Sequence, residues 1–297
     1  MALRLQLNAG SRWITPLENR PRPFANYRFI LVILASPQTV GFMKILLKPI
    51  QLVYWTYAAL LFVCLMLLVF PIVVLASFFG RVKGGNTIYA ICRIWGGVWM
   101  FLIGISHRNI YETAPGEREA YIFVANHVSY MDIPVIFKAI RKRPVRVLGK
   151  AEMKSIPIFG FIYSRAVVMV DRKSSSNRAK SVRQSKSILG RNISIFIYPE
   201  GTFNETGKPL KNFYDGAFRI AIETRTPIMP VLFLDTFDRL NSESIFSLKP
   251  GRSRAVFLEE SSVDNLTLAD LQALKQKVFL QMEEKLLAYH ASWIRQE

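Results

Sequence analysis

An uncharged run near the N-terminus is the sequence feature that most constrains the fold. Between Lys48 and Arg81 the chain reads PIQLVYWTYAALLFVCLMLLVFPIVVLASFFG, which is 32 residues without a charged side chain. Because a helix needs only about 20 apolar residues to cross a bilayer, this length predicts contact with lipid. Pro71 interrupts the run, which leaves open one tilted span or two shorter helices that enter and leave the same leaflet. We therefore predict a membrane-anchoring helical segment over residues 43–85.

The residues before this segment show no periodicity. They include the basic, Pro-rich stretch NRPRPFANYR, and we predict a poorly ordered N-terminal extension over residues 1–42. The apolar run is too long for the core of a cleaved signal peptide. Met43 begins MKILLKPIQ and would itself serve as a start, so we hypothesise that the extension is dispensable.

Composition agrees with a membrane connection and narrows the partners. The 297 residues are 51% hydrophobic with a mean hydropathy of +0.22, and 39 basic against 21 acidic residues give a net charge of +18. Such a charge suits anionic lipid, an acidic carrier protein or nucleic acid. Residues 138–191 alone hold 15 Lys and Arg against two acidic residues. The uncharged run and the lack of a recognisable binding motif argue against nucleic acid.

Two cysteines bear on the compartment. Cys64 and Cys92 lie in apolar surroundings without the spacing of a metal site, which predicts buried, reduced thiols. Reduced thiols favour a catalytic domain on the cytoplasmic face of the membrane.

From residue 86 the pattern alternates between helices and strands. After an apolar helix over 86–106, short β-rich runs alternate with helical patterns, and the last helix opens with the capping box Thr267–Asp270. This pattern predicts an α/β fold with a mixed, mainly parallel sheet flanked by helices, forming one catalytic domain over residues 86–297. The predicted strands are 120–126, 145–149, 166–171, 193–199, 227–235 and 254–259, and the predicted helices between them are 132–142, 174–189 and 215–225.

The motif NHVSYMD follows the first predicted strand. His127 would lie at the carboxyl end of that strand, where α/β folds place ligands, and Asp132 in the first turn of the next helix. A turn between them lets the carboxylate reach the imidazole and stabilise its cation, so that the other ring nitrogen can deprotonate a hydroxyl. The alternative is structural, because Ser129 and Asp132 also have the spacing of a capping box.

A second polar cluster follows the strand ISIFIYP. Glu200, Gly201 and Thr202 of YPEGT would lie at the same sheet edge as His127. Taken alone they could form an ordinary turn. His107 and His290, the other two histidines, have no ligand spacing relative to His127, so we predict no metal site.

Four motifs in order resemble those of the glycerolipid acyltransferases, whose members include the 1-acyl-sn-glycerol-3-phosphate (lysophosphatidate) acyltransferases. They are NHVSYMD, GKAEMKSIPIFGFI with VVMVDR (149–172), YPEGT, and TPIMPVLF (226–233), and the resemblance covers roughly residues 86–240. It implies a membrane-associated O-acyltransferase of phospholipid biosynthesis without a cofactor. Such an enzyme moves a fatty acyl chain from acyl-CoA or acyl carrier protein to the free hydroxyl of 1-acyl-sn-glycerol-3-phosphate.

The resemblance also implies roles for particular residues. His127 would be the general base and Asp132 its orienting partner. The residues that would help to bind the acceptor are Lys150, Arg172, Glu200, Gly201 and Thr202. Because the chain has no G-x-S-x-G motif, we expect direct attack by the acceptor hydroxyl, without an acyl-enzyme.

The chain lacks two cations that the family pattern places on the acceptor side. Phe203 stands where many members carry Arg, and Asp215 stands where a basic residue usually precedes Gly-Ala-Phe. Arg172, Lys208 or Lys211 could supply the missing charge. Two alternatives follow, namely an acyltransferase for a different lysolipid and a non-catalytic membrane-bound lipid-binding protein.

Overall fold

The computed structural model describes residues 37–116, 120–170 and 175–295. The chain divides into two units, Met1–Pro49 and Ile50–Glu297. In the first unit the described residues form the beginning of helix α2, and the second unit holds all the other elements. Arg172 lies outside the described residues.

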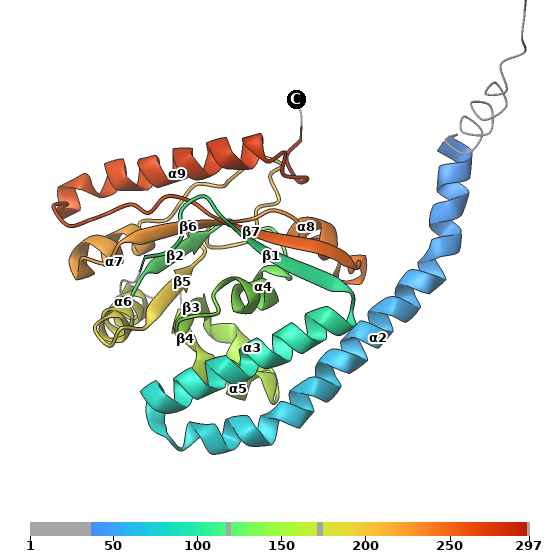
Figure 1. Ribbon diagram of the computed structural model, residues 1–297, viewed down its shortest axis with the longest axis horizontal. Coiled ribbons are helices and arrows are strands. Elements are labelled where there is room, and N and C mark those ends of the chain that lie inside the picture. The colour runs from blue at the N-terminus through green and yellow to red at the C-terminus, as the bar shows by residue number, and fades with distance from the viewer. Residues whose placement is uncertain (1–36, 117–119, 171–174, 296–297) are drawn as a thin grey trace, which may run out of the picture. The chain divides into compact units, whose positions relative to one another are not determined.

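The helices and strands of the described residues follow the predicted alternation (Figure 1). The helices are α2 (Pro37–Ser77), α3 (Gly85–Leu102), α4 (Asp132–Ala139), α5 (Phe159–Ala166), α6 (Ser175–Leu189), α7 (Gly216–Thr224), α8 (Thr236–Arg239) and α9 (Leu271–Ala288), with a π-turn at Gly80–Gly84 and 3-10 turns at Ala151–Ser155, Ile245–Ser247 and Leu268–Asp270. The strands are β1 (Ile105–Tyr111), β2 (Ile122–Ala125), β3 (Val145–Lys150), β4 (Val167–Val170), β5 (Ser194–Ile197), β6 (Ile228–Phe233) and β7 (Gly251–Phe257).

The strands form one mixed sheet in the order β1-β7-β6-β2-β5-β3-β4. Strands β6, β2, β5, β3 and β4 run parallel to one another, whereas β7 is antiparallel to β6 and pairs in parallel with β1. The prediction of a mixed, mainly parallel sheet is confirmed. Every residue of β2, β5 and β6 is buried, as expected for strands covered on both faces.

Helices cover the two faces of the sheet (Figure 1). On one face α7 and α9 pack against the strands, with Phe218 and Val278 fully buried in that core. On the other face α3 and α4 cover a second core that contains Met100 and Ile136. The sheet therefore lies between two apolar layers, and its strand ends are free to carry polar loops.

Helix α2 continues through Pro71 without a break and is followed by α3, which runs back beside it (Figure 1). Gly80, with φ of 79°, lies in the turn between the two helices. The indole nitrogen of Trp99 in α3 donates to the Ala58 carbonyl at 2.8 Å, and the Phe62 ring lies 4.7 Å from that of Trp95. From Ile50 onward, α2 therefore forms a helical hairpin with α3.

The other side of α2 remains exposed. Lys48–Ser77 is the one helical stretch of the described residues that is long and apolar enough to cross a membrane. Leu60 is 61% exposed and Leu68 is 70% exposed. Cys64 shares this exposure, so the prediction that it is buried is wrong, whereas Cys92 in α3 is buried; both thiols are free.

Three elements, strand β1 and helices α5 and α8, were not predicted. The apolar helix expected over 86–106 ends at Leu102, and β1 begins at Ile105. The polar residues of β1 hide its strand character, which comes from pairing along its whole length with β7. Helix α5 lies within the second motif. The six predicted strands are otherwise present within a few residues of their expected bounds.

Candidate active site

Two polar loops meet where adjacent parallel strands end. Strand β2 ends at Ala125 and β5 ends at Ile197, and the two strands pair in parallel. The loops that follow them touch, because the backbone N–H of His127 donates to Glu200 Oε1 at 2.8 Å. The expectation that the two clusters share one sheet edge is confirmed.

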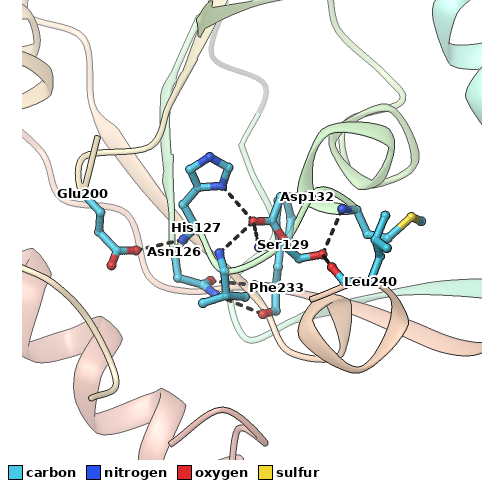
Figure 2. A network of polar contacts seen from close by, with 9 residues as sticks. Asn126, His127, Ser129, Asp132, Glu200, Phe233 and Leu240 are labelled. Carbon is cyan, nitrogen blue, oxygen red and sulfur yellow. Dashed lines mark hydrogen bonds and ion pairs between the residues drawn. The ribbon is translucent and has the colours of Figure 1, made fainter. Parts of the chain in front are cut away.

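His127 and Asp132 form a hydrogen-bonded pair. The distance from His127 Nδ1 to Asp132 Oδ2 is 2.8 Å, with the Asp132 side chain fully buried and that of His127 15% exposed (Figure 2). Because a carboxylate can only accept, Nδ1 carries the proton and Nε2 keeps its lone pair. Nε2 has no hydrogen-bond partner among the residues that the structure describes. The pair therefore presents a basic nitrogen on the partly exposed side of the ring.

Asp132 also fixes the loop that carries His127. Its Oδ2 accepts from the backbone N–H groups of Val128 and Ser129 at 2.8 and 2.9 Å. Helix α4 begins at Asp132 without a side-chain cap, and the Ser129 hydroxyl donates to the Leu240 carbonyl instead (Figure 2). Only half of a capping box is present, so the structural alternative accounts for part of this geometry and leaves the contact with His127 unexplained.

Asn126 and Ser129 anchor the same loop to distant parts of the chain. The Asn126 side chain donates to the Phe233 carbonyl at 3.0 Å and accepts from the Phe233 N–H at 2.8 Å (Figure 2). Both Asn126 and Ser129 are fully buried. Sequence reasoning missed Asn126, whose only signal was a polar side chain directly after an apolar strand, and it considered Ser129 only as part of a capping box.

Glu200 joins the two loops and is 2% exposed. Its Oε1 accepts from His127 N–H and its Oε2 accepts from Lys211 N–H, each at 2.8 Å. Burial raises the pKa of Glu200 to about 8, while the two amide donors act in the opposite direction. Gly201 follows with φ of 78°, a conformation that favours glycine, and its N–H donates to the Tyr198 carbonyl at 3.0 Å.

Aromatic rings surround the imidazole. The ring of Tyr198 stacks on that of His127 with centroids 3.9 Å apart, and the Phe203 ring lies 4.4 Å from the imidazole on a tilted approach. Phe203 in turn contacts Tyr130 at 4.8 Å. These contacts fix the plane of the imidazole and make the wall beside it apolar.

A cavity of about 450 Å³ adjoins the pair through Phe203. It is lined by Lys150, Thr202, Phe203, Glu205, Thr206 and Lys211. Lys150 reaches it from the carboxyl end of β3, the strand next to β5. The Lys211 ammonium donates to the Thr202 hydroxyl at 2.6 Å and to the Phe203 carbonyl at 3.3 Å. The arrangement can bind an anion beside a general base.

The other departure from the family pattern lies away from this cavity. Asp215 precedes α7 and pairs with Lys275 of α9 at 2.6 Å, which lowers the pKa of Asp215. Neither Asp215 nor Lys208 is among the residues that line the cavity. Of the two substituted positions, only Phe203 therefore faces it.

The other two histidines are not part of this site. His107 in β1 contacts the Ser253 hydroxyl at 3.1 Å, and burial lowers its pKa to about 4. His290 is exposed after α9. Within the described ranges, no group of three or more His, Cys, Asp and Glu side chains could hold a metal ion.

Comparisons with known proteins identify relatives of this chain. Residues 106–234 match the sequence model of a family described as Acyltransferase. The 1-acyl-sn-glycerol-3-phosphate acyltransferase of Haemophilus influenzae is 31% identical over 166 residues, which are 55% of this chain and 68% of that protein. The protein of the same description from Cocos nucifera is 31% identical over 160 residues, covering 53% of this chain and 50% of that one. The chain thus spans about half to two thirds of these relatives.

A solved structure shares the fold. The 1-acyl-sn-glycerophosphate (LPA) acyltransferase PlsC of Thermotoga maritima superposes with a TM-score of 0.62, covering 82% of this chain and 100% of that chain. The two sequences are 21% identical, so this likeness supports the architecture alone.

Proposed function

Since this chain belongs to the family of 1-acyl-sn-glycerol-3-phosphate acyltransferases, we propose that it is a membrane-associated O-acyltransferase of phospholipid synthesis. The acyl donor is a thioester of CoA or of acyl carrier protein. The acceptor is the free hydroxyl of 1-acyl-sn-glycerol-3-phosphate.

The observation that carries this proposal is the bond between His127 and Asp132. At 2.8 Å it holds the proton on Nδ1 and leaves Nε2 as a base. The buried carboxylate of Asp132 also stabilises the imidazolium that forms when Nε2 takes up a proton. A binding protein without activity has no need of this arrangement, so it favours the enzyme.

The proposed reaction uses this geometry. Nε2 of His127 removes the proton of the acceptor hydroxyl as the oxygen attacks the thioester carbonyl, and a C–O bond forms. The tetrahedral intermediate then collapses, the C–S bond breaks, and the imidazolium returns its proton to the departing sulfur. The products are the ester and a free thiol, and His127 ends as it began.

The other predicted site residues divide into two groups. Lys150 and Thr202 line the cavity beside the dyad, which supports their role in binding the acceptor. Both oxygens of Glu200 are engaged by backbone amides, which supports a positioning role for Glu200 and for Gly201 next to it. We propose Arg172 as an acceptor ligand only because the second motif resembles that of the family.

The test is acyl transfer by purified protein with release of thiol as the readout. His127→Ala should lower kcat by about 10²–10⁴-fold, the usual contribution of a general base. His290→Gln is the matched control, because His290 is exposed and lies outside the site, and it should keep its activity. Transfer by His127→Ala within twofold of wild type would exclude the dyad.

The same assay separates the alternatives for the acceptor. Phe203 places an aromatic ring against the imidazole, which would also suit a lysolipid with an uncharged or zwitterionic headgroup. A panel of lysophosphatidate and other lysolipids identifies the best acceptor. No thiol release with any of them would instead support the non-catalytic lipid-binding protein.

We further propose that the helical hairpin of α2 and α3 binds the membrane and that the catalytic domain faces the cytoplasm. Phe78 and Phe79 at the turn of the hairpin are 80% and 70% exposed, and an exposed apolar surface of this kind is typical of lipid contact. The free thiols of Cys64 and Cys92 suit a reducing compartment.

Vesicle flotation tests the membrane proposal. Leu68→Asp combined with Phe79→Asp should weaken flotation with phosphatidylglycerol vesicles, because two exposed apolar contacts are replaced by charges. Leu280→Asp is the control, since Leu280 is 51% exposed on α9. Equal flotation of all three proteins would contradict the proposal. Protease protection in inverted membrane vesicles then reports which face carries the domain.

A further inference from the structure

Two ammonium groups meet in the cavity beside the dyad. Lys150 and Lys211 both line it, and neither forms an ion pair with a carboxylate among the described residues. Glu205 is the one acidic residue of the lining, and its side chain is exposed. The cavity therefore carries a net positive charge from side chains that the fold leaves unneutralised.

Lys211 is held more firmly than Lys150. Its backbone N–H donates to Glu200 Oε2 at 2.8 Å, and its ammonium donates to Thr202 and to the Phe203 carbonyl. An ammonium has three hydrogens, so these two contacts leave one for an anion. Lys150, by contrast, is exposed and makes no side-chain hydrogen bond among the described residues.

Glu200 joins the backbone segments that carry His127 and Lys211. One oxygen of its carboxylate holds the backbone of His127 and the other holds the backbone of Lys211. Phe203 lies between the two functional groups, with its ring against the imidazole and its carbonyl on the ammonium. The base and the cation thus both contact Phe203, an arrangement that suits a substrate with a hydroxyl near an anionic group.

We propose that Lys211 determines acceptor specificity by binding the anionic headgroup of the lysolipid. This inference rests on the proposed acyl transfer and assigns the recognition of its acceptor. The headgroup lies against the ammonium groups of Lys211 and Lys150, and the glycerol packs against the ring of Phe203. Lys211 then supplies the positive charge that is missing at position 203, where this chain has Phe203.

The neighbouring cations fit this role less well. Lys208 lies on the same loop but is exposed outside the cavity lining, and its backbone N–H is bound to the Thr206 hydroxyl at 3.2 Å. Lys275 is paired with Asp215. Lys208 therefore serves as a matched control with the same charge on the same loop.

The experiment compares Lys211→Met with Lys208→Met. Methionine keeps the backbone bond to Glu200 and most of the apolar stem, so Lys211→Met should fold. Its KM for lysophosphatidate should rise about 10- to 100-fold, as expected when a charge-assisted bond is lost, with kcat and the KM of the acyl donor little changed. Lys208→Met should stay within twofold of wild type in all three constants. Equal values for the two variants would overturn the inference.

Two further variants sharpen the test. Glu205→Gln removes the one negative charge of the lining and should lower KM for lysophosphatidate. Phe203→Arg should restore acceptor affinity when it is combined with Lys211→Met, because it returns a cation to the cavity. Failure of both, with the fold intact by circular dichroism, would show that the cavity does not hold the headgroup.

Failure of the proposed function gives a different result. If wild type transfers acyl chains only to uncharged lysolipids and Lys211→Met does the same, the specificity role falls and the chemistry stands. If wild type transfers acyl chains to no lysolipid, the equilibrium binding of glycerol 3-phosphate tests the headgroup site by itself. Binding by wild type that is lost in Lys211→Met supports the site. Equal binding by the two proteins excludes it.

Discussion

The two loops of the site are held in different ways. In the β2 loop, residues 126–132, the polar side chains are buried and bond to backbone atoms, as Asn126 does with Phe233 and Asp132 with the amides of its own turn. In the β5 loop, residues 198–215, Glu200 and Asn204 are bound in this way, while Thr202 and Lys211 line a cavity. A side chain that holds backbone fixes the shape of its loop, whereas a side chain that lines a cavity can contact a bound molecule. Under the proposed function, the β2 loop carries the chemistry and the β5 loop carries the choice of acceptor.

The largest expected effect is that of Asp132→Asn in the β2 loop. An amide can turn its NH₂ towards Nδ1, which favours the wrong imidazole tautomer, so we expect kcat to fall by about 10³–10⁴-fold. The bonds to Val128 and Ser129 also weaken, so thermal unfolding must be measured in parallel. Asp264→Asn, at an exposed position, is the control. A normal rate with a normal pH profile would mean that the carboxylate only holds the turn.

Asn126→Ala is expected to have the second largest effect, on stability. It leaves the buried N–H and carbonyl of Phe233 without partners, and each such group costs about 1–3 kcal/mol. Urea unfolding measures the loss. Asn241→Ala removes one exposed contact with the Ser244 amide and should cost less than about 1 kcal/mol. Similar losses in the two variants would remove the distinction between a buried anchor and a surface bond.

The sequence predicted the His127–Asp132 pair of the β2 loop but not the anchors of that loop. His127 and Asp132 are five residues apart, so one local turn brings them together. The partners of Asn126 and Ser129 are 107 and 111 residues away, and only the assembled sheet brings them near. The strands show the same dependence on distant partners. The apolar strands were predicted from their own residues, whereas the polar strand β1 was missed because its partner β7 lies far along the chain.

The β5 loop was predicted less completely. The sequence placed Glu200 at the sheet edge correctly, since β5 is apolar and lies beside β2. It could not distinguish Lys208 from Lys211 as a cavity residue, because the loop has no periodicity and its shape depends on the buried side chains of Glu200 and Asn204. Asp215 was read as a loss of charge near the acceptor, but its partner Lys275 comes from α9.

A pH-dependent effect tests the anchor of the β5 loop. Burial raises the pKa of Glu200 to about 8, from 4.5 in the unfolded chain, so the folded protein retains a proton that the unfolded chain has lost. Stability from this group is therefore present below about pH 4.5 and is lost as pH rises towards 8, by at most about 1.4 kcal/mol per pH unit. Glu200→Gln cannot titrate. The difference in unfolding free energy between wild type and this variant should shrink from pH 5 to pH 8, and a constant difference would contradict the raised pKa.

The smallest expected effect is that of Asp215→Asn at the end of the β5 loop, and it sharpens the comparison because a null result is informative. Asp215 is half exposed and its partner is Lys275 of α9, so the loss of this pair should cost about 0.2–1 kcal/mol of stability and less at high salt. Acyl transfer should be unchanged in kcat and in both KM values, because Asp215 does not line the cavity. Lys275→Met should reproduce the same small loss of stability, and the double variant should lose no more than either single one, as expected for two halves of one contact. A change in the KM for lysophosphatidate in Asp215→Asn but not in Lys275→Met would instead mean that the charge at position 215 acts on the acceptor. The residues that select the acceptor would then extend along the whole β5 loop, beyond those around Lys211.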